Sequence, residues 1–239
     1  MFHPQGPTFF ELARQALSST ERGYDLLGPK FDLTPFRTPP LFFEAFKKRL
    51  LEEVDVATFN NVLDICCGTG AAMQELAPLC QGCLVGIDRS QGMLRQAAKN
   101  LNAIEGRFKL VRGNAFQMPF QSKFDLAVSF GAFGHVRPRQ EALFIAEIYR
   151  VLATGGRFAF ITHRMPSRFS PTYYLARGFN IAMHIRNWLI RPPFIMYYLT
   201  FLWPDIESKL VQAGFAVHSK PLFSEPSNRS LFQFVIAEK

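Results

Sequence analysis

The residues best placed to do chemistry lie in a turn that follows an apolar run. Residues 62–65 read Val-Leu-Asp-Ile, and the five residues from Cys66 to Gly70 are all small. A buried parallel strand reads as a continuous apolar stretch, and a turn whose backbone approaches a ligand needs residues without bulky side chains. A second apolar run ends in Asp88, 18 residues after Gly70. That offset suits a carboxylate that accepts hydrogen bonds from ribose hydroxyls, so the spacing predicts a nucleoside ligand.

Alternating strand and helix patterns must position this turn. The sequence predicts strands over 62–65, 84–88, 108–112, 124–130 and 156–162, and helices over 71–79, 91–101 and 139–152. This order predicts an α/β fold with a doubly wound, mostly parallel sheet. After a helix over 204–213, apolar runs at 215–218 and 231–237 flank the turn-forming residues 225–228, which predicts an antiparallel C-terminal hairpin and seven strands in all.

Two further segments differ from this alternation. We expect residues 1–55 to form an N-terminal helical lid segment, in which Ser18 and Glu21 fit a capping box, and residues 56–239 to form the ligand-binding α/β domain. Within that domain, the aromatic-rich residues 164–203 are too long for a simple crossover and predict a helical cap insertion whose inner face is apolar. Tyr197 and Tyr198 are its expected acceptor contacts. Its longest uncharged run has 13 residues, fewer than the roughly 20 that cross a bilayer.

Composition and charge limit the partners. The net charge is +8, but the basic residues are scattered, which disfavours nucleic-acid binding. The arginines of the cap could bind an acidic group or make a peripheral membrane contact. The start of the chain does not resemble a signal peptide, so we expect a cytoplasmic protein. The four cysteines lie in pairs at opposite ends of a predicted helix, which disfavours a metal or redox site.

Four stretches of the chain carry a family resemblance. They are residues 62–70, residues 86–94 from Gly86 to Leu94, Gly113-Asn114-Ala115, and the helix-to-strand turn over 147–156. In this order they resemble successive blocks of the class I S-adenosylmethionine-dependent methyltransferases, closest to the small-molecule ubiquinone and menaquinone C-methyltransferases. The resemblance implies a Rossmann-like fold, S-adenosylmethionine as cofactor with S-adenosylhomocysteine as product, and methyl transfer to a small acceptor, which the aromatic cap suggests is apolar or aromatic.

The resemblance also implies roles for single residues. Gly68 and Gly70 would lie against the methionine part of the cofactor, Asp64 would hold its ammonium group, and Asp88 would bind both ribose hydroxyls. Met93 would cover the adenine, although a methionine at helical spacing is also ordinary core. The implied cofactor site is completed by Cys66, Arg89, Asn114, Ala115 and Phe130. Cys66 stands where glycine is usual, and Asn114 stands where aspartate is common, with an amide oxygen that accepts equally well.

Two residues are candidates for catalysis. His135 follows the predicted fourth strand, where open α/β sheets place their sites, and could act as a base or only bond to backbone. Tyr24 lies in a segment that resembles the entry of the family's lid. Two other functions remain open from the sequence. One is a noncatalytic nucleoside-binding or assembly protein on the same fold, and the other is a nicotinamide-dependent dehydrogenase, because Cys66-x-Gly68-x-x-Ala71 is a degenerate Gly-x-Gly-x-x-Gly.

Overall fold

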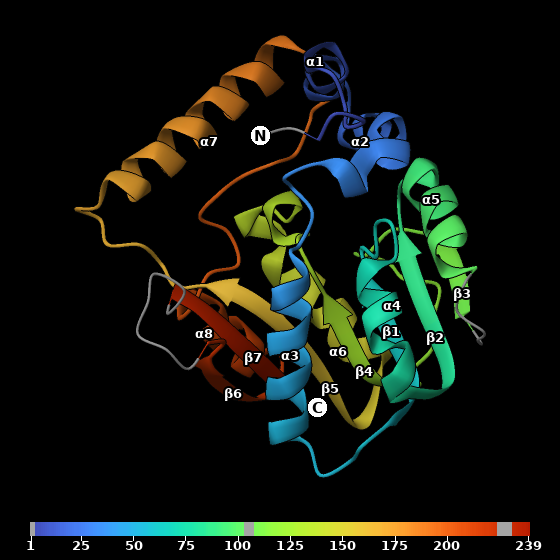
Figure 1. The fold of residues 1–239 in the computed structure, drawn as a ribbon. Helices are drawn as coiled ribbons and strands as arrows, with labels where there is room; N and C mark the ends of the chain where they lie inside the picture. The colour runs from blue at the N-terminus through green and yellow to red at the C-terminus, as the bar shows by residue number, and fades with distance from the viewer. Residues whose placement is uncertain (1–2, 103–107, 224–230) are drawn as a thin grey trace.

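A seven-stranded sheet forms the centre of the molecule. The computed structural model describes residues 3–102, 108–223 and 231–239. The strand order is β3-β2-β1-β4-β5-β7-β6, in which β1 to β5 are parallel and β7 is antiparallel to both of its neighbours (Figure 1). The strands are β1 Phe59–Ile65, β2 Cys80–Asp88, β3 Phe108–Arg112, β4 Phe124–Ser129, β5 Leu152–His163, β6 Ala216–Pro221 and β7 Phe232–Glu238. The chain order reverses between β1 and β4, and open sheets bind ligands beside such a switch point.

Helices cover both faces of the sheet. On one face lie α3 Pro40–Glu53, α4 Ala71–Leu76 and α5 Gln91–Leu101, which bury Phe46, Met73 and Ala97 against the strands. On the other face α6 Glu141–Val151 and α8 Asp205–Gln212 bury Phe144 and Leu210. Figure 1 shows the first group in front of the sheet and the second behind it. Alternate residues of each buried strand point to the two layers, which explains why these strands read as continuous apolar runs.

Two short helices precede α3 and pack over the carboxyl edge of the sheet. They are α1 Phe9–Leu17 and α2 Thr20–Leu27, followed by the 3-10 turn η1 Gly28–Leu33. The predicted capping box at Ser18 and Glu21 was wrong. Thr8 and Glu11 form the capping box of α1, Ser18 ends that helix, and Ser19 caps α2 through a hydrogen bond from the Arg22 N–H. Glu21 is thereby free to form ion pairs across the site.

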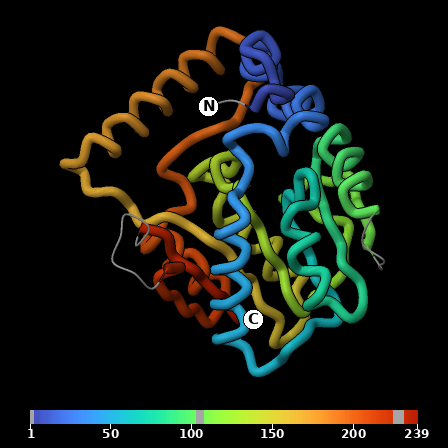
Figure 2. The backbone as a smooth tube through the Cα atoms, in the orientation of Figure 1, coloured from blue at the N-terminus to red at the C-terminus, as the bar shows by residue number. Residues whose placement is uncertain are grey.

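The insertion between β5 and α8 contains one long helix, α7 Pro171–Leu189, and a return segment over 190–203. Its two ends meet at its base, where the Met165 N–H donates to the Trp203 carbonyl and the Trp203 N–H donates to the His163 carbonyl. The tube in Figure 2 shows the insertion arching away from the sheet and returning to it. Among the described residues, no helix is both long enough and apolar enough to cross a bilayer.

The predicted elements are all present, with shifts at their ends. The α5 helix and the β3 strand have the predicted bounds, whereas β5 begins at Leu152, four residues earlier than predicted, and the first crossover helix ends at Leu76 and continues as the 3-10 turn η2 Ala77–Leu79. The C-terminal hairpin is confirmed by the antiparallel pairing of β6 and β7. Its predicted turn over 225–228 lies outside the described residues.

Candidate active site

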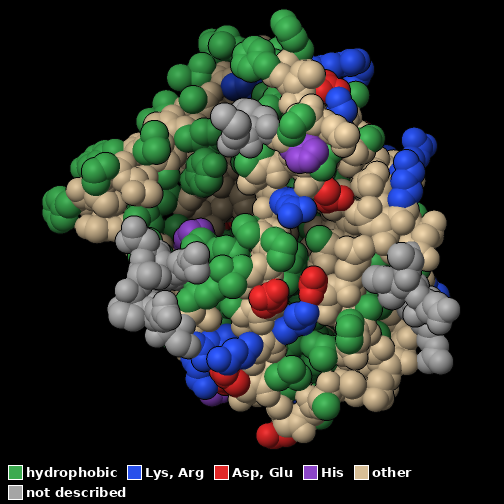
Figure 3. All heavy atoms as spheres, viewed as in Figure 1, with side chains coloured by type: hydrophobic (Ala, Val, Ile, Leu, Met, Phe, Trp, Pro, Cys, Tyr) green, Lys and Arg blue, Asp and Glu red, His purple; other side chains and the backbone are tan. Residues whose placement is uncertain are grey.

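The predicted site residues converge on one cleft at the carboxyl edge of the sheet. The cleft has a volume of about 1530 Å³ and is bounded by the loops after β1 to β4, the N-terminal segment and the return segment of the insertion. In the view of Figure 3 the molecule is hollowed between α7 and its body. The sequence named ten residues for the cofactor and two for catalysis. Gly70 lies outside the lining, and the other eleven line the cleft: Tyr24, Asp64, Cys66, Gly68, Asp88, Arg89, Met93, Asn114, Ala115, Phe130 and His135.

The turn after β1 is left-handed at three residues. Cys66, Gly68 and Gly70 have φ angles of 59°, 54° and 82°. A Cβ added to Gly68 would meet no atom within 4 Å, because this residue faces open space, so close backbone approach by a ligand is possible there. At Gly70 an added Cβ would lie 3.3 Å from the Ala97 Cβ, so this glycine serves the packing of α4 against α5. Cys66 adopts the left-handed conformation without being glycine, and burial raises the pKa of its thiol.

Asp64 is the strongest evidence for a cationic ligand group. Its side chain is 1% exposed, and its Oδ2 has no hydrogen-bond partner among the described residues. Burial, together with the nearby Asp88 carboxylate, raises the pKa of Asp64 well above its ordinary value. A buried carboxylate without a partner is costly unless a positive group approaches it. The ammonium group of a bound amino acid would supply that charge, so Asp64 fits the methionine part of S-adenosylmethionine.

Asp88 ends β2 with both carboxylate oxygens held by backbone. Oδ2 accepts from the Gly68 N–H at 2.9 Å and Oδ1 accepts from the Ser90 N–H at 2.8 Å. Burial raises the pKa of Asp88, while these hydrogen bonds oppose the rise. Each oxygen keeps a further lone pair, so the fixed carboxylate can accept from two neighbouring hydroxyls. This geometry fits the expected ribose contact and ties it to the glycine turn.

The pocket expected for adenine is mostly apolar. Met93 is 3% exposed and also lines the cleft. It can therefore pack in the core and contact an adenine ring at the same time. Phe130 packs between Phe43 and Phe46, with ring centroids 4.9 and 4.8 Å away. The Asn114 Oδ1 accepts a hydrogen bond from the Phe116 N–H at 3.2 Å. This contact orients the side-chain amide and leaves its NH2 group as the part better able to contact a ligand. An aspartate at this position would accept the same backbone hydrogen bond.

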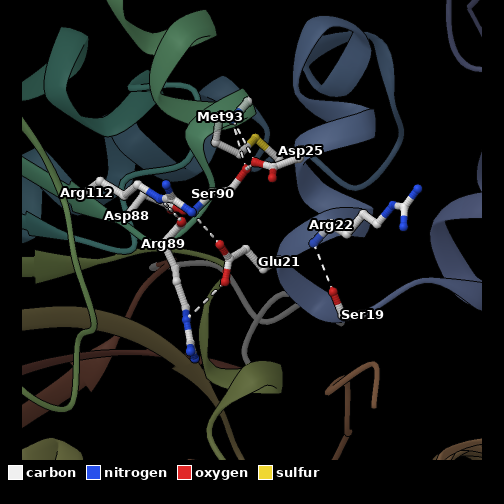
Figure 4. Close-up of polar contacts among 10 residues, drawn as sticks. Ser19, Glu21, Arg22, Asp25, Asp88, Arg89, Ser90, Met93 and Arg112 are labelled. Atoms are coloured by element: carbon white, nitrogen blue, oxygen red, sulfur yellow. Dashed lines mark hydrogen bonds and ion pairs between the residues drawn. The ribbon is translucent and has the colours of Figure 1, made fainter. Parts of the chain in front are cut away.

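Helix α2 is bound to the ribose side of the cleft through two acidic residues that the sequence did not place in the site (Figure 4). Asp25 Oδ1 accepts from the Ser90 hydroxyl at 2.7 Å and from the Gly92 N–H at 2.8 Å. Glu21 pairs with Arg112 at 2.6 Å and with the largely exposed Arg89 at 3.4 Å. The carboxylates of Glu21 and Asp25 belong to no sequence motif for a ligand site, so these contacts could not be predicted from the sequence.

A third acidic residue fastens the turn that follows α2. Asp32 accepts from the Thr69 hydroxyl at 2.5 Å and from the Asn100 amide at 2.9 Å. Helices α2 and α5 also approach each other closely, since a Cβ added to Gly92 of α5 would lie 2.3 Å from the Asp25 carbonyl oxygen of α2. Glycine is therefore required where α2 meets α5, and the N-terminal segment is held against the cofactor loops at several points.

The two candidate catalytic residues contact each other. The Tyr24 hydroxyl lies 2.9 Å from the His135 Nε2, and the His135 Nδ1 lies 2.5 Å from the Ile195 carbonyl oxygen. A carbonyl only accepts, so Nδ1 carries the proton, Nε2 is the acceptor, and the Tyr24 hydroxyl donates to it. Burial lowers the pKa of His135 and raises the pKa of Tyr24. Both side chains are therefore neutral near pH 7, with Tyr24 and His135 both lining the cleft.

The wall beside this pair is aromatic and comes from segments far apart in the chain. The Tyr24 ring stacks on Phe194 at 6.1 Å, and Phe133 stacks on Phe201 at 4.1 Å. The return segment contributes Ile195 to Thr200 to the lining, whereas none of the nineteen residues of α7, all of them described, lines this cleft. The sequence predicted that the inner face of a helical cap would form the pocket, and the return segment forms the wall instead.

Comparisons with known proteins agree with this geometry. A family profile described as a methyltransferase domain matches residues 62–156. An uncharacterized methyltransferase of Synechocystis sp. is 31% identical over 190 residues, which cover 76% of this chain and 78% of that protein. A demethylmenaquinone methyltransferase of Lactiplantibacillus plantarum is 31% identical over 162 residues, which cover 66% of this chain and 68% of that protein.

The fold also matches a solved structure. A SAM-dependent methyltransferase of Methanosarcina mazei has a TM-score of 0.60 at 21% identity, covering 80% of this chain and 96% of that chain. The four sequence blocks, the strand order and the two relatives that share most of their length agree. The chain therefore belongs to the class I S-adenosylmethionine-dependent methyltransferases.

Proposed function

We propose that this methyltransferase acts on a small aromatic acceptor that carries an ionisable hydroxyl, such as a quinol, and that Tyr24 and His135 remove the hydroxyl proton. The observation that carries the proposal is the hydrogen bond from the Tyr24 hydroxyl to the His135 Nε2 in the lining of the cleft. A neutral histidine whose Nδ1 donates to a backbone carbonyl keeps Nε2 as the acceptor, and it is suited to general-base catalysis.

The proton has a continuous path. An acceptor hydroxyl placed against the Tyr24 oxygen donates to it as the Tyr24 proton moves to His135 Nε2, and the Ile195 carbonyl stabilises the resulting imidazolium through Nδ1. S-adenosylmethionine, when bound, supplies a methyl group that is already activated as a sulfonium. The acceptor loses one proton and gains one methyl group, and His135 later returns the proton to solvent.

The surroundings support an apolar, aromatic acceptor. Phe31, Phe133, Met196, Tyr198 and Leu199 all line the cleft. Such side chains bind an aromatic ring through apolar burial and edge or face contacts. A relative of similar length is named as a demethylmenaquinone methyltransferase, which is consistent with a quinol ring in this position.

In this proposal the parts of the chain have separate tasks. Residues 1–55 act as a lid that closes over the cofactor loops, because Glu21, Asp25 and Asp32 bind them. Residues 56–239 form the domain that binds S-adenosylmethionine, and within it the insertion over 164–203 bounds the acceptor. The remaining expected contacts of the cofactor, at Cys66, Arg89, Ala115 and Phe130, belong to the same proposal, since each lines the cleft.

An acceptor assay tests the proposal. Purified protein with S-adenosylmethionine is offered a demethylated quinol, a phenol without a second ring substituent, and a primary amine, and products are identified by mass spectrometry. We expect the quinol to gain one methyl group at least tenfold faster than the amine. Methylation of the amine alone would contradict the proposed acceptor class.

Tyr198 offers a test of the acceptor wall. Tyr197 and Tyr198 both line the cleft, but Tyr198 is half exposed, whereas Tyr197 is buried and its hydroxyl accepts a hydrogen bond from the Asn187 amide. Tyr198→Ala should raise the KM for the acceptor several-fold and leave the affinity for S-adenosylhomocysteine unchanged. Tyr197→Ala removes a structural contact between α7 and the return segment, so loss of stability is the expected result there.

A further inference from the structure

The long helix of the insertion turns a set of large apolar side chains outward, although Phe179 on its inner side packs on Tyr198 with ring centroids 4.8 Å apart. The best buried residue of α7 is Asn187, which is 8% exposed and bonds to both the carbonyl and the N–H of Phe194. In contrast, Leu175 and Trp188 are each 77% exposed. A helix that packs on a globular protein normally turns such large apolar side chains inward, because burial of apolar surface is what stabilises its attachment.

The outward apolar residues form one continuous face. Positions 174, 181, 185 and 188 repeat at intervals of seven, four and three, which places them on one side of an α-helix. Figure 3 shows hydrophobic side chains gathered along α7 and over α1. The exposed apolar residues of α7 and the residue two positions before it are Phe169, Tyr174, Leu175, Ile181, Ile185, Trp188 and Leu189. An exposed face of this extent indicates a binding surface.

The charged residues of the insertion itself have a single sign. The sequence contains no Asp or Glu between Glu147 and Asp205, while the insertion contains five arginines. Arg168, three residues before α7, and Arg177, within α7, are both exposed. Two copies that met through this face would oppose arginines to arginines without a carboxylate from the insertion to neutralise them. A surface that is anionic outside and apolar beneath its charges suits both the exposed apolar face and the arginines.

We propose that α7 is an interfacial helix that docks the enzyme on an anionic lipid bilayer. Leu175, Ile185 and Trp188 would enter the boundary between head groups and acyl chains, and the exposed Arg168 and Arg177 would contact lipid phosphates. In this proposal α7 lies along the surface and does not cross it, because no described helix is apolar enough over a sufficient length to span a bilayer. The docking surface is separate from the cleft of the proposed function, because no α7 residue lines that cleft.

Vesicle flotation with the full chain tests this docking without any methyl acceptor. Phosphatidylcholine vesicles that contain about a third phosphatidylglycerol should carry the protein to the top of the gradient, and vesicles of phosphatidylcholine alone should bind it at least tenfold more weakly. Trp188 provides a second signal, because Trp203 is already buried at 8% exposure. Tryptophan emission should shift to the blue on addition of the anionic vesicles.

Matched variants separate the two contributions. Leu175→Ser combined with Trp188→Ser should lower vesicle binding more than tenfold, whereas Val211→Ser, at an exposed position of α8, should not change it. Arg168→Gln and Arg177→Gln should each lower binding to the anionic vesicles about fivefold. Arg95→Gln, at an exposed position of α5, is the control for charge.

Three outcomes would overturn the proposal. One is absence of binding to the anionic vesicles. The second is binding that the Leu175 and Trp188 substitutions leave unchanged. The third is a dimer in sedimentation velocity that the same substitutions abolish, since the face would then join two copies. Each outcome leaves the methyl transfer of the proposed function untouched, because the acceptor assay uses no membrane.

Discussion

At the scale of single residues, the nearby carboxylates of Asp64 and Asp88 differ in their hydrogen-bond partners. Asp88 has backbone donors on both oxygens, whereas the Asp64 Oδ2 has no partner among the described residues. The site thus contains a fixed acceptor and an unsatisfied negative group within one cleft. Such an unsatisfied group lowers the stability of the free protein and raises its affinity for a cation.

Asp64→Asn should therefore stabilise the free protein and weaken the cofactor complex. Because the folded state raises the pKa of Asp64, its contribution to stability is present at low pH and is lost as the pH rises through that raised pKa. At pH 7.5 the variant should melt about 2 to 4 °C higher, which corresponds to about 1 kcal/mol. Its affinity for S-adenosylhomocysteine should fall at least tenfold, in line with loss of a charged hydrogen bond.

The matched control is Asp125→Asn. The Asp125 carboxylate accepts from the N–H groups of Asn60 and Asn61 at 3.0 and 2.8 Å, so this substitution should lower the melting temperature and leave cofactor affinity unchanged. Calorimetry and thermal melts measure both variants. An Asp64→Asn protein that melts lower and binds as tightly as the wild type would contradict the assignment of the ammonium contact.

Asp88→Ala should weaken binding of S-adenosylhomocysteine by about 2 to 3 kcal/mol, because two hydroxyls lose one charged acceptor and the Gly68 N–H loses its partner. Asn114→Asp should bind within about threefold of the wild type, since either side chain accepts from the Phe116 N–H. Titration calorimetry distinguishes the two. If Asp88→Ala kept its affinity within about twofold, the ribose contact would be elsewhere.

At the scale of elements, α2 joins the two halves of the site. Tyr24 reaches His135 on the acceptor side, and the next residue, Asp25, reaches the Ser90 and Gly92 groups on the cofactor side. Neighbouring residues of one helix thereby connect the loop after β2 to the loop after β4. Closure of this helix over a bound cofactor would also set the position of the Tyr24 hydroxyl.

Asp25→Ala should loosen that connection. The Ser90 hydroxyl and the Gly92 N–H lose their acceptor, so amide exchange in α2 should speed up and the KM for S-adenosylmethionine should rise about tenfold. The control is Glu11→Gln in the neighbouring helix α1. It alters an exposed ion pair with Lys30 of η1 and should leave both quantities unchanged. Hydrogen exchange measured by mass spectrometry would contradict this role if α2 were equally protected in all three proteins.

The sequence predicted the sheet and the cofactor loops because both depend on local patterns. Apolar runs, the small residues from Cys66 to Gly70 and the spacing to Asp88 are visible without any tertiary contact. The contacts of Asp25, Asp32 and the Ile195 carbonyl are not visible in this way, since each joins residues that lie 37 to 67 positions apart in the chain. Tyr24 and His135 were named separately, and only the fold brings them within hydrogen-bonding distance.

At the scale of the whole molecule, cofactor binding should be coupled to stability of the fold, because the cleft is built from the N-terminal segment, four strand ends and the insertion. S-adenosylhomocysteine at a hundred times its Kd should stabilise the protein by about 2.7 kcal/mol and raise its melting temperature by roughly 5 to 10 °C. NADH at the same concentration should produce no shift. A shift with NADH alone would contradict the family's cofactor and revive the dehydrogenase alternative.

The pH dependence of kcat tests most directly whether the Tyr24 and His135 pair moves the acceptor proton. Burial lowers the pKa of His135 below its ordinary 6.5, so kcat for a demethylated quinol should fall to half of its plateau only below pH 6.5, as the imidazole takes up a proton. His135→Asn and Tyr24→Phe should each lower kcat by about a hundredfold or more and abolish this fall, with S-adenosylhomocysteine affinity within about twofold of wild type. A kcat within about threefold of wild type in both variants, with the same pH profile, would contradict this role of the pair.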